Sequence, residues 1–107
     1  MTSLILLILL QVPVVNSASF IRWDDGNVGI NTETRIYIER TAGISPDGTP
    51  DASVGGGLLE WAITAGNGRW FAVVTAFDPL SGIESGPGNE VEFHVLGPPG
   101  NTRVVVP

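Results

Sequence analysis

The chain has 107 residues and a formal net charge of −6, with neither lysine nor cysteine. This length fits one domain, and the acidic balance argues against binding to nucleic acid or to anionic membrane surfaces, which attract basic patches. Because cysteine is absent, disulfides, thiolate zinc sites and thiol catalysis are excluded.

The N-terminus carries an unbroken apolar run, Leu4–Leu10, which continues through Val12–Val15. A membrane span needs about 20 apolar residues, so this run is too short to cross a bilayer. It fits the apolar region of a secretory signal, with Val15-Asn16-Ser17 as the cleavage context before Ala18, although the basic start of such a signal is missing. We expect residues 1–17 to be a signal peptide, and the alternative is a retained hydrophobic arm or first strand.

Alternating apolar and polar residues follow this run and predict a series of strands. The 14 glycines and 8 prolines suit the turns between such strands better than they suit helices. Ser19–Trp23 alternates, with Ile21 and Trp23 on one face, and a turn follows at 24–27.

The central part of the chain is a glycine- and proline-rich segment between two further strands. Thr34–Arg40 alternates, with Ile36 on its inward face. Residues 41–57 read as a long loop with at most a short edge strand. Leu59–Ala65 alternates again and ends at a turn over residues 66–68.

The stretch from Trp70 to Val95 predicts an antiparallel pair of strands joined by a loop rich in glycine, proline and serine. Its first strand has two distinct faces, and its second has one polar face that meets water. On the first strand, Trp70, Ala72, Val74 and Ala76 point one way and Phe71, Val73, Thr75 and Phe77 the other; on the second, Val91, Phe93 and Val95 oppose Glu90, Glu92 and His94.

These strands carry a resemblance to a known family. The order and spacing of three segments resemble the last two strands of a bacterial fibronectin type III domain. The segments are Phe71–Asp78, Gly82–Pro87 and Asn89–Val91. Ile21–Asp24 and Thr34–Arg40 resemble the second and third strands of the same family. The resemblance implies an all-β fold, an immunoglobulin-like antiparallel sandwich of about six to seven strands.

Two departures from the family pattern matter. The family usually has a tyrosine where Trp70 stands, and the tyrosine hydroxyl ties down a backbone corner. Tryptophan fills the volume but lacks that hydroxyl, which puts the tie in doubt. The family's first strand is also missing if residues 1–17 are removed, whereas Gln11–Val15 supplies it if they are retained.

The end of the chain reads as a tail beyond the sandwich, which we expect to span residues 18–96. Residues 97–107 begin with the linker-like break Gly97–Gly100, and Thr102–Val106 is strongly β-prone. We expect Thr102–Val106 to pair as a strand, either on its own sheet or on the sheet edge of a neighbour.

No group of residues forms a reactive constellation, so we expect neither an enzyme nor a cofactor or metal site. His94 is the single histidine, and it lies on an outward strand position without a cysteine or second histidine beside it. The turn acids match no calcium-loop spacing, and aspartate is ordinary turn chemistry; they are Asp24, Asp25, Asp47 and Asp51.

The facing of the strands predicts a core and a surface patch. The residues predicted to anchor the core are Trp23, Ile36, Trp61, Trp70, Val74, Val91 and Phe93. If the strands at 34–40, 70–77 and 90–95 are neighbours, as the resemblance implies, then Tyr37, Phe71, Val73 and Phe77 form an apolar patch rimmed by charge. Such a patch marks an interface, unless the loop 41–57 or the N-terminal arm folds over it, or the facing is shifted by one residue.

We therefore expect a non-catalytic fibronectin type III-like module, secreted or exposed at the cell surface. Its partner would be a protein or a glycan, or another copy bound through a sheet edge, and neither nucleic acid nor a membrane span is expected. The alternative is a virion structural protein, such as a phage decoration or tail component, with the N-terminal segment retained.

Overall fold

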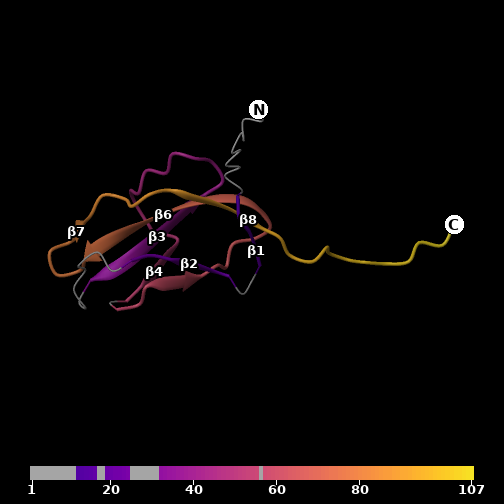
Figure 1. Cartoon of the computed structure of the whole chain (residues 1–107), viewed down its shortest axis with the longest axis horizontal. Helices are drawn as coiled ribbons and strands as arrows, with labels where there is room; N and C mark the ends of the chain where they lie inside the picture. Colours follow the sequence, from indigo (N-terminus) through magenta and orange to yellow (C-terminus); the bar gives the residue numbers. More distant parts are fainter. Residues whose placement is uncertain (1–11, 17–18, 25–31, 56) are drawn as a thin grey trace, which may run out of the picture.

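The computed structural model describes residues 12–16, 19–24, 32–55 and 57–107. Strands are the only regular elements in these ranges, so the described part of the chain is all-β, as predicted (Figure 1). No helix in the described ranges is long and apolar enough to span a membrane. In chain order the strands are β1 (Val14–Val15), β2 (Phe20–Arg22), β3 (Glu33–Glu39), β4 (Ala52–Val54), β5 (Glu60–Ala62), β6 (Gly68–Asp78), β7 (Ile83–Glu84) and β8 (Val91–Val95).

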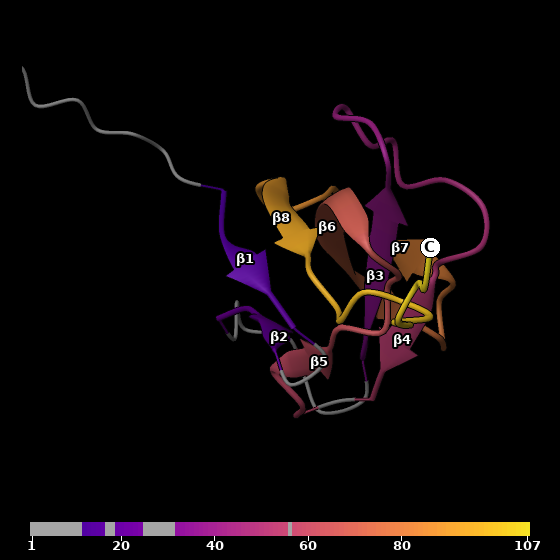
Figure 2. The same ribbon diagram turned by 90° about the vertical axis from the view of Figure 1, so that its right-hand side faces the viewer.

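The strands form two sheets that face each other as in a sandwich (Figure 2). The larger sheet has the order β1-β8-β6-β3-β4, with β7 added to β6, and the smaller sheet is β2-β5. All pairs are antiparallel except β1 with β8. The predicted adjacency of the strands at 34–40, 70–77 and 90–95 is confirmed, because β6 lies between β3 and β8. The expected edge strand in the central loop is β4.

The register gives each strand of the larger sheet an inner and an outer face, because paired residues point to the same side. Ile36 pairs with Val74 on the inner face, which lies toward the smaller sheet, and Tyr37 pairs with Val73 on the outer face. The buried core cluster consists of Ile63, Ala72, Phe93 and Val95; the side chains packed against it are Val15, Ile21, Ile38, Trp61, Ala65 and Trp70.

The residues predicted to anchor the core differ in burial. Ile36 is 0% exposed and Phe93 is 3% exposed. Trp23, Trp61, Trp70 and Val74 are half-buried. Val91 is 39% exposed, so its assignment to the core is wrong. The physical reason is that the smaller sheet, within the described ranges, consists of two short strands, β2 and β5, which leave part of the opposite inner face uncovered.

Trp70 makes a hydrogen bond to the backbone at the corner before β6, where the sequence had left such a bond in doubt because a tyrosine hydroxyl is missing. Its indole Nε1–H donates a hydrogen bond of 2.8 Å to the carbonyl oxygen of Gly66, four residues upstream. The guanidinium of Arg40 lies 3.7 Å from the centroid of the indole ring, and it also donates to the carbonyl of Asn67 at 3.1 Å. The indole therefore both fills space and anchors the backbone, which is the role of the corner tyrosine in immunoglobulin-like sandwiches.

The N-terminal segment contributes the edge strand of the larger sheet. β1 runs parallel to β8, and the amides of His94 and Leu96 donate to the carbonyls of Pro13 (2.9 Å) and Val15 (3.0 Å). This strand lies within the segment predicted to be a signal peptide. Residues 1–11 and the cleavage positions 17–18 lie outside the described residues, so cleavage stays a prediction.

The C-terminal segment, residues 97–107, extends away from the sandwich (Figure 1). It contains no strand, so the expectation that Thr102–Val106 pairs on its own sheet is wrong for this structure. Val104, Val105 and Val106 are 90%, 74% and 83% exposed. Pairing of this segment with a neighbouring molecule stays a prediction.

Candidate binding surfaces of the sandwich

The predicted apolar patch lies on the outer face of the larger sheet, but it is not an open surface. Tyr37 is 4% exposed and Val73 is 3% exposed, whereas Phe71 and Phe77 are half-buried. The facing of these side chains was predicted correctly, because Tyr37 and Val73 pair on the outer face. Their exposure was predicted wrongly, because other parts of the chain cover them.

The loop between β3 and β4 supplies part of this cover. The backbone amides of Gly43 and Ile44 donate to the carboxylate of Glu90 at 3.0 and 2.9 Å. Glu90 immediately precedes β8, and β6 lies between β3 and β8. A loop that leaves β3 and is bound at Glu90 therefore crosses the outer face of β6. This is the folded-over loop that the sequence left open as an alternative.

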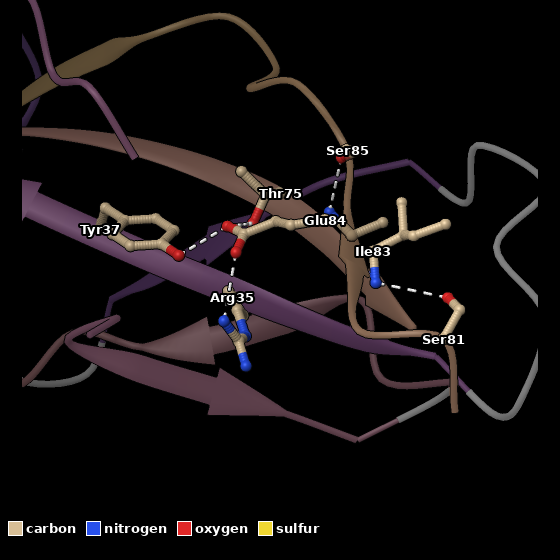
Figure 3. Close-up of polar contacts among 8 residues, drawn as sticks. Arg35, Tyr37, Thr75, Ser81, Ile83, Glu84 and Ser85 are labelled. Carbon is tan, nitrogen blue, oxygen red and sulfur yellow. Dashed lines mark hydrogen bonds and ion pairs between the residues drawn. The ribbon is translucent and has the colours of Figure 1, made fainter. Parts of the chain in front are cut away.

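A cluster of polar side chains occupies the same outer face (Figure 3), and its arginine lies over the ring of Phe77. We call Arg35, Tyr37, Thr75 and Glu84 the Glu84 cluster. One carboxylate oxygen of Glu84 accepts a hydrogen bond from Arg35 at 3.1 Å, and the other accepts from the hydroxyls of Thr75 at 2.7 Å and Tyr37 at 2.5 Å. Three strands, β3, β6 and β7, thus meet at one carboxylate.

The turn after β6 positions Glu84. Both carboxylate oxygens of Asp78 accept hydrogen bonds within this turn, from the Leu80 amide and the Ser81 hydroxyl. Gly82 adopts a φ of +74°, which only glycine takes readily. The chain returns along β6, where Glu84 pairs with Phe77. The turn therefore places the Glu84 carboxylate on the outer face of the larger sheet.

The charges in the Glu84 cluster balance one another. Arg35 and Glu84 form an ion pair with side chains 21% and 22% exposed, and the guanidinium lies 3.5 Å from the ring centroid of Phe77. Burial raises the pKa of Glu84, but the hydrogen bonds from Thr75 and Tyr37 and the charge of Arg35 outweigh it, so the pKa is lowered. Burial, followed by the hydrogen bond to Glu84, raises the pKa of Tyr37.

These contacts assign the Glu84 cluster to structure rather than chemistry. The carboxylate already accepts three hydrogen bonds from the protein, so it has little capacity left for a substrate proton. Sequence reasoning missed Glu84, which it quoted only as part of the Gly82–Pro87 motif. The available signal was that Arg35, Tyr37 and Thr75 share one face, which places a cation and two hydroxyl donors together.

An open cleft of about 570 Å³ lies on the opposite, inner side of β6. Its floor is formed by Ala72, Val74 and Ala76. One wall is the end of β2 with the residues after it, Ile21–Asp24, and the other is the segment 85–89. We refer to this feature as the inner cleft. Val91 also lines it, which explains the exposure of that side chain.

The inner cleft borders a free strand edge. Among the described residues, β2 pairs only with β5, through bonds such as Trp23 N–H to the carbonyl of Leu59 and Ile63 N–H to that of Ser19, both 3.0 Å. Successive residues of a strand direct their N–H and C=O groups to opposite sides. Because Ser19 and Trp23 are bonded to β5 and its flanks, the backbone groups of Phe20 and Arg22 point away from β5. Figure 2 shows β2 between β5 and β1, with its free edge toward the β1–β8 side.

The described residues offer no metal centre, since no group of three or more histidine or acidic side chains lies close enough to hold an ion. His94 is exposed on β8. The carboxylate of Asp51 accepts a hydrogen bond of 2.8 Å from the Ile38 amide, which is a structural use of a turn acid. Asp25 lies outside the described residues.

No family model, curated protein or solved structure matches this chain. The fold alone is therefore established, as an all-β arrangement of two sheets, and the function has to be argued from the surfaces described above.

Proposed function

We propose that the chain is a non-catalytic binding module that holds an extended segment of another polypeptide in the inner cleft. The single observation that carries this proposal is the position of the cleft beside the free edge of β2. An exposed strand edge offers unpaired backbone donors and acceptors, which recruit an added strand. On the floor of the cleft, the half-buried Val74 and Ala76 provide the apolar contact that such a strand buries.

A polypeptide suits the cleft better than a glycan does. Glycan sites use aromatic rings as exposed platforms, but Trp61 and Trp70 pack against the core, and Trp23, the one tryptophan that lines the cleft, is half-buried. Asp24 and Asn89 are polar residues among those that line the cleft, whereas the guanidinium of Arg22 is paired with Glu60 at 3.1 Å. Asp24 and Asn89 supply the few oriented contacts that give a largely apolar site its specificity.

Two features support placing the module in the fibronectin type III-like class. The strand order places β6 between β3 and β8 as that resemblance implies, and the Trp70 tie reproduces the corner of such sandwiches. The same analogy, together with the apolar N-terminal run, supports a secreted or cell-surface location. The alternative, a structural protein of a virion, is favoured by the exposed apolar segment 97–107, which suits contacts between copies in an assembly.

A peptide selection tests the proposed function. Random heptapeptides are selected on the immobilised full chain, and the affinities of enriched peptides are measured by fluorescence anisotropy on two matched variants. Ala76→Leu fills the floor of the cleft, whereas Ala62→Leu adds the same atoms on an exposed position of β5. We expect Ala76→Leu to weaken binding about tenfold or more and Ala62→Leu to leave it unchanged.

The melting temperature of each variant controls for folding. Peptides that bind both variants and the parent equally, or a selection that enriches none, would overturn the assignment of the cleft.

A further inference from the structure

We infer that the occupant of the inner cleft is the segment 102–106 of a second copy of this chain, so that copies join head to tail. This inference rests on the proposed function, because it names the partner of the same cleft. The segment is Thr-Arg-Val-Val-Val, and its three valines are among the most exposed large hydrophobic side chains described. Valine is strongly favoured in strands, and nothing in the described sandwich pairs with this segment.

The alternation of the segment matches the two sides of the cleft. Successive side chains of an extended strand point to opposite faces. With Arg103 facing water, Val105 also faces outward, and Val104 and Val106 point to the apolar floor. Asp24 lines the cleft and is exposed, so the cleft carries a charge opposite to that of Arg103. Arg103 is the one charged residue of 97–107 in a chain of net charge −6.

The positions of the segment and the cleft favour a second molecule over the same one. The segment 85–89, which walls the cleft, follows directly after β7. Figure 1 shows β7 at one end of the molecule and the segment 97–107 leaving from the other end. The 85–89 wall of the cleft and the segment 97–107 therefore extend toward opposite ends of the molecule, and a contact between them repeats from copy to copy instead of closing on itself as a two-fold dimer does.

Sedimentation and native mass spectrometry of the full chain over a range of concentrations test this inference. We expect species at multiples of 11.3 kDa whose population grows with concentration. The double variant Val104→Asp with Val106→Asp should shift the association midpoint about tenfold or more to higher concentration. Val105→Asp is the matched control and should stay close to the parent. All three positions are exposed, so the fold tolerates these changes.

A mixing experiment isolates the head-to-tail geometry. Ala76→Leu retains the segment but has a filled cleft, and the Val104→Asp/Val106→Asp variant retains the cleft but has a defective segment. Each alone should be monomeric, and their mixture should give a one-to-one dimer that does not grow further.

Three results would overturn the inference. The first is a parent chain that is monomeric at every concentration, including one in which the segment docks on its own molecule. The second is an equal shift of the association midpoint by Val105→Asp and by the double variant. The third is the absence of a dimer in the mixture. If selected heptapeptides still bind the cleft in any of these cases, the proposed function stands and only its partner is wrong. If none bind, both fail.

Discussion

Glu84 shows how one side chain from a turn stabilises three strands. Its carboxylate accepts hydrogen bonds from Arg35, Thr75 and Tyr37 on the outer face of the larger sheet. Groups that are mostly buried and linked in this way cost more to lose singly than exposed pairs do. The contrast within this chain is the pair of Arg69 and Glu92, whose side chains are 65% and 31% exposed.

Glu84→Gln should lower the free energy of unfolding by about 1–3 kcal/mol, because the charge-assisted bonds to Arg35 and the hydroxyls are weakened. Glu92→Gln, the matched control in the exposed pair, should cost about 0–1 kcal/mol. Urea unfolding followed by tryptophan fluorescence measures both. Equal midpoints for the two variants would show that the Glu84 cluster adds no stability.

The contribution of Glu84 should depend on pH. Its pKa in the folded chain is lowered from the ordinary value of 4.5, so the unfolded chain binds the proton more readily. The stabilisation is therefore complete above pH 4.5 and is lost as the pH falls through the lower folded pKa. Unfolding free energies of the parent and Glu84→Gln should converge between pH 4.5 and strongly acidic pH. A constant difference down to pH 2 would contradict this assignment.

At the scale of elements, strand positions and facing were predictable and exposure was not. The alternation in β3, β6 and β8 depends only on the order of residues, and it placed Tyr37 and Val73 on the correct face. Whether that face is open depends on the path of the loop after β3, which is held by backbone amides binding Glu90. Backbone donors carry no sequence signature, so such a contact cannot be predicted from residue types.

The corner at Trp70 is a second element whose stabilising bond the sequence did not reveal. Trp70→Phe keeps an aromatic ring but removes the N–H that donates to Gly66. We expect a loss of about 1–2 kcal/mol, part from the hydrogen bond and part from volume. Trp61→Phe, in the same core, should lose mainly the volume part. Chemical denaturation compares the two, and a smaller loss for Trp70→Phe would argue that the indole tie adds nothing.

At the scale of the whole molecule, the two sheets are unequal and this inequality creates the cleft. The larger sheet presents an inner face that β2 and β5 cover only in part. Val91 was predicted to lie in the core because its strand position is inward, and the inward position is correct. It is 39% exposed because neither β2 nor β5, the described strands of the smaller sheet, covers it. The number of strands in the opposing sheet is a property of the assembled fold, so the cleft could not be predicted from any single stretch.

The removal of residues 1–17 tests how the N-terminal segment contributes to the larger sheet. This removal deletes β1 and with it the backbone bonds to His94 and Leu96. We expect the shortened chain to fold with an unfolding free energy lower by about 2–4 kcal/mol, from two hydrogen bonds and the packing of Val15. Differential scanning calorimetry of both forms measures the change, and an unaltered melting temperature would contradict a structural role for β1.

The central claim, that an extended polypeptide adds to the free edge of β2, is tested most directly by amide hydrogen exchange measured by NMR. The amides of Phe20 and Arg22 point away from β5, whereas that of Trp23 is bonded to Leu59. We predict that the amides of Phe20 and Arg22 exchange rapidly in the dilute chain and become protected when a cleft-binding heptapeptide is added, while Trp23 is protected throughout. Slow exchange of Arg22 before any peptide is added, or no change on binding, would contradict the account.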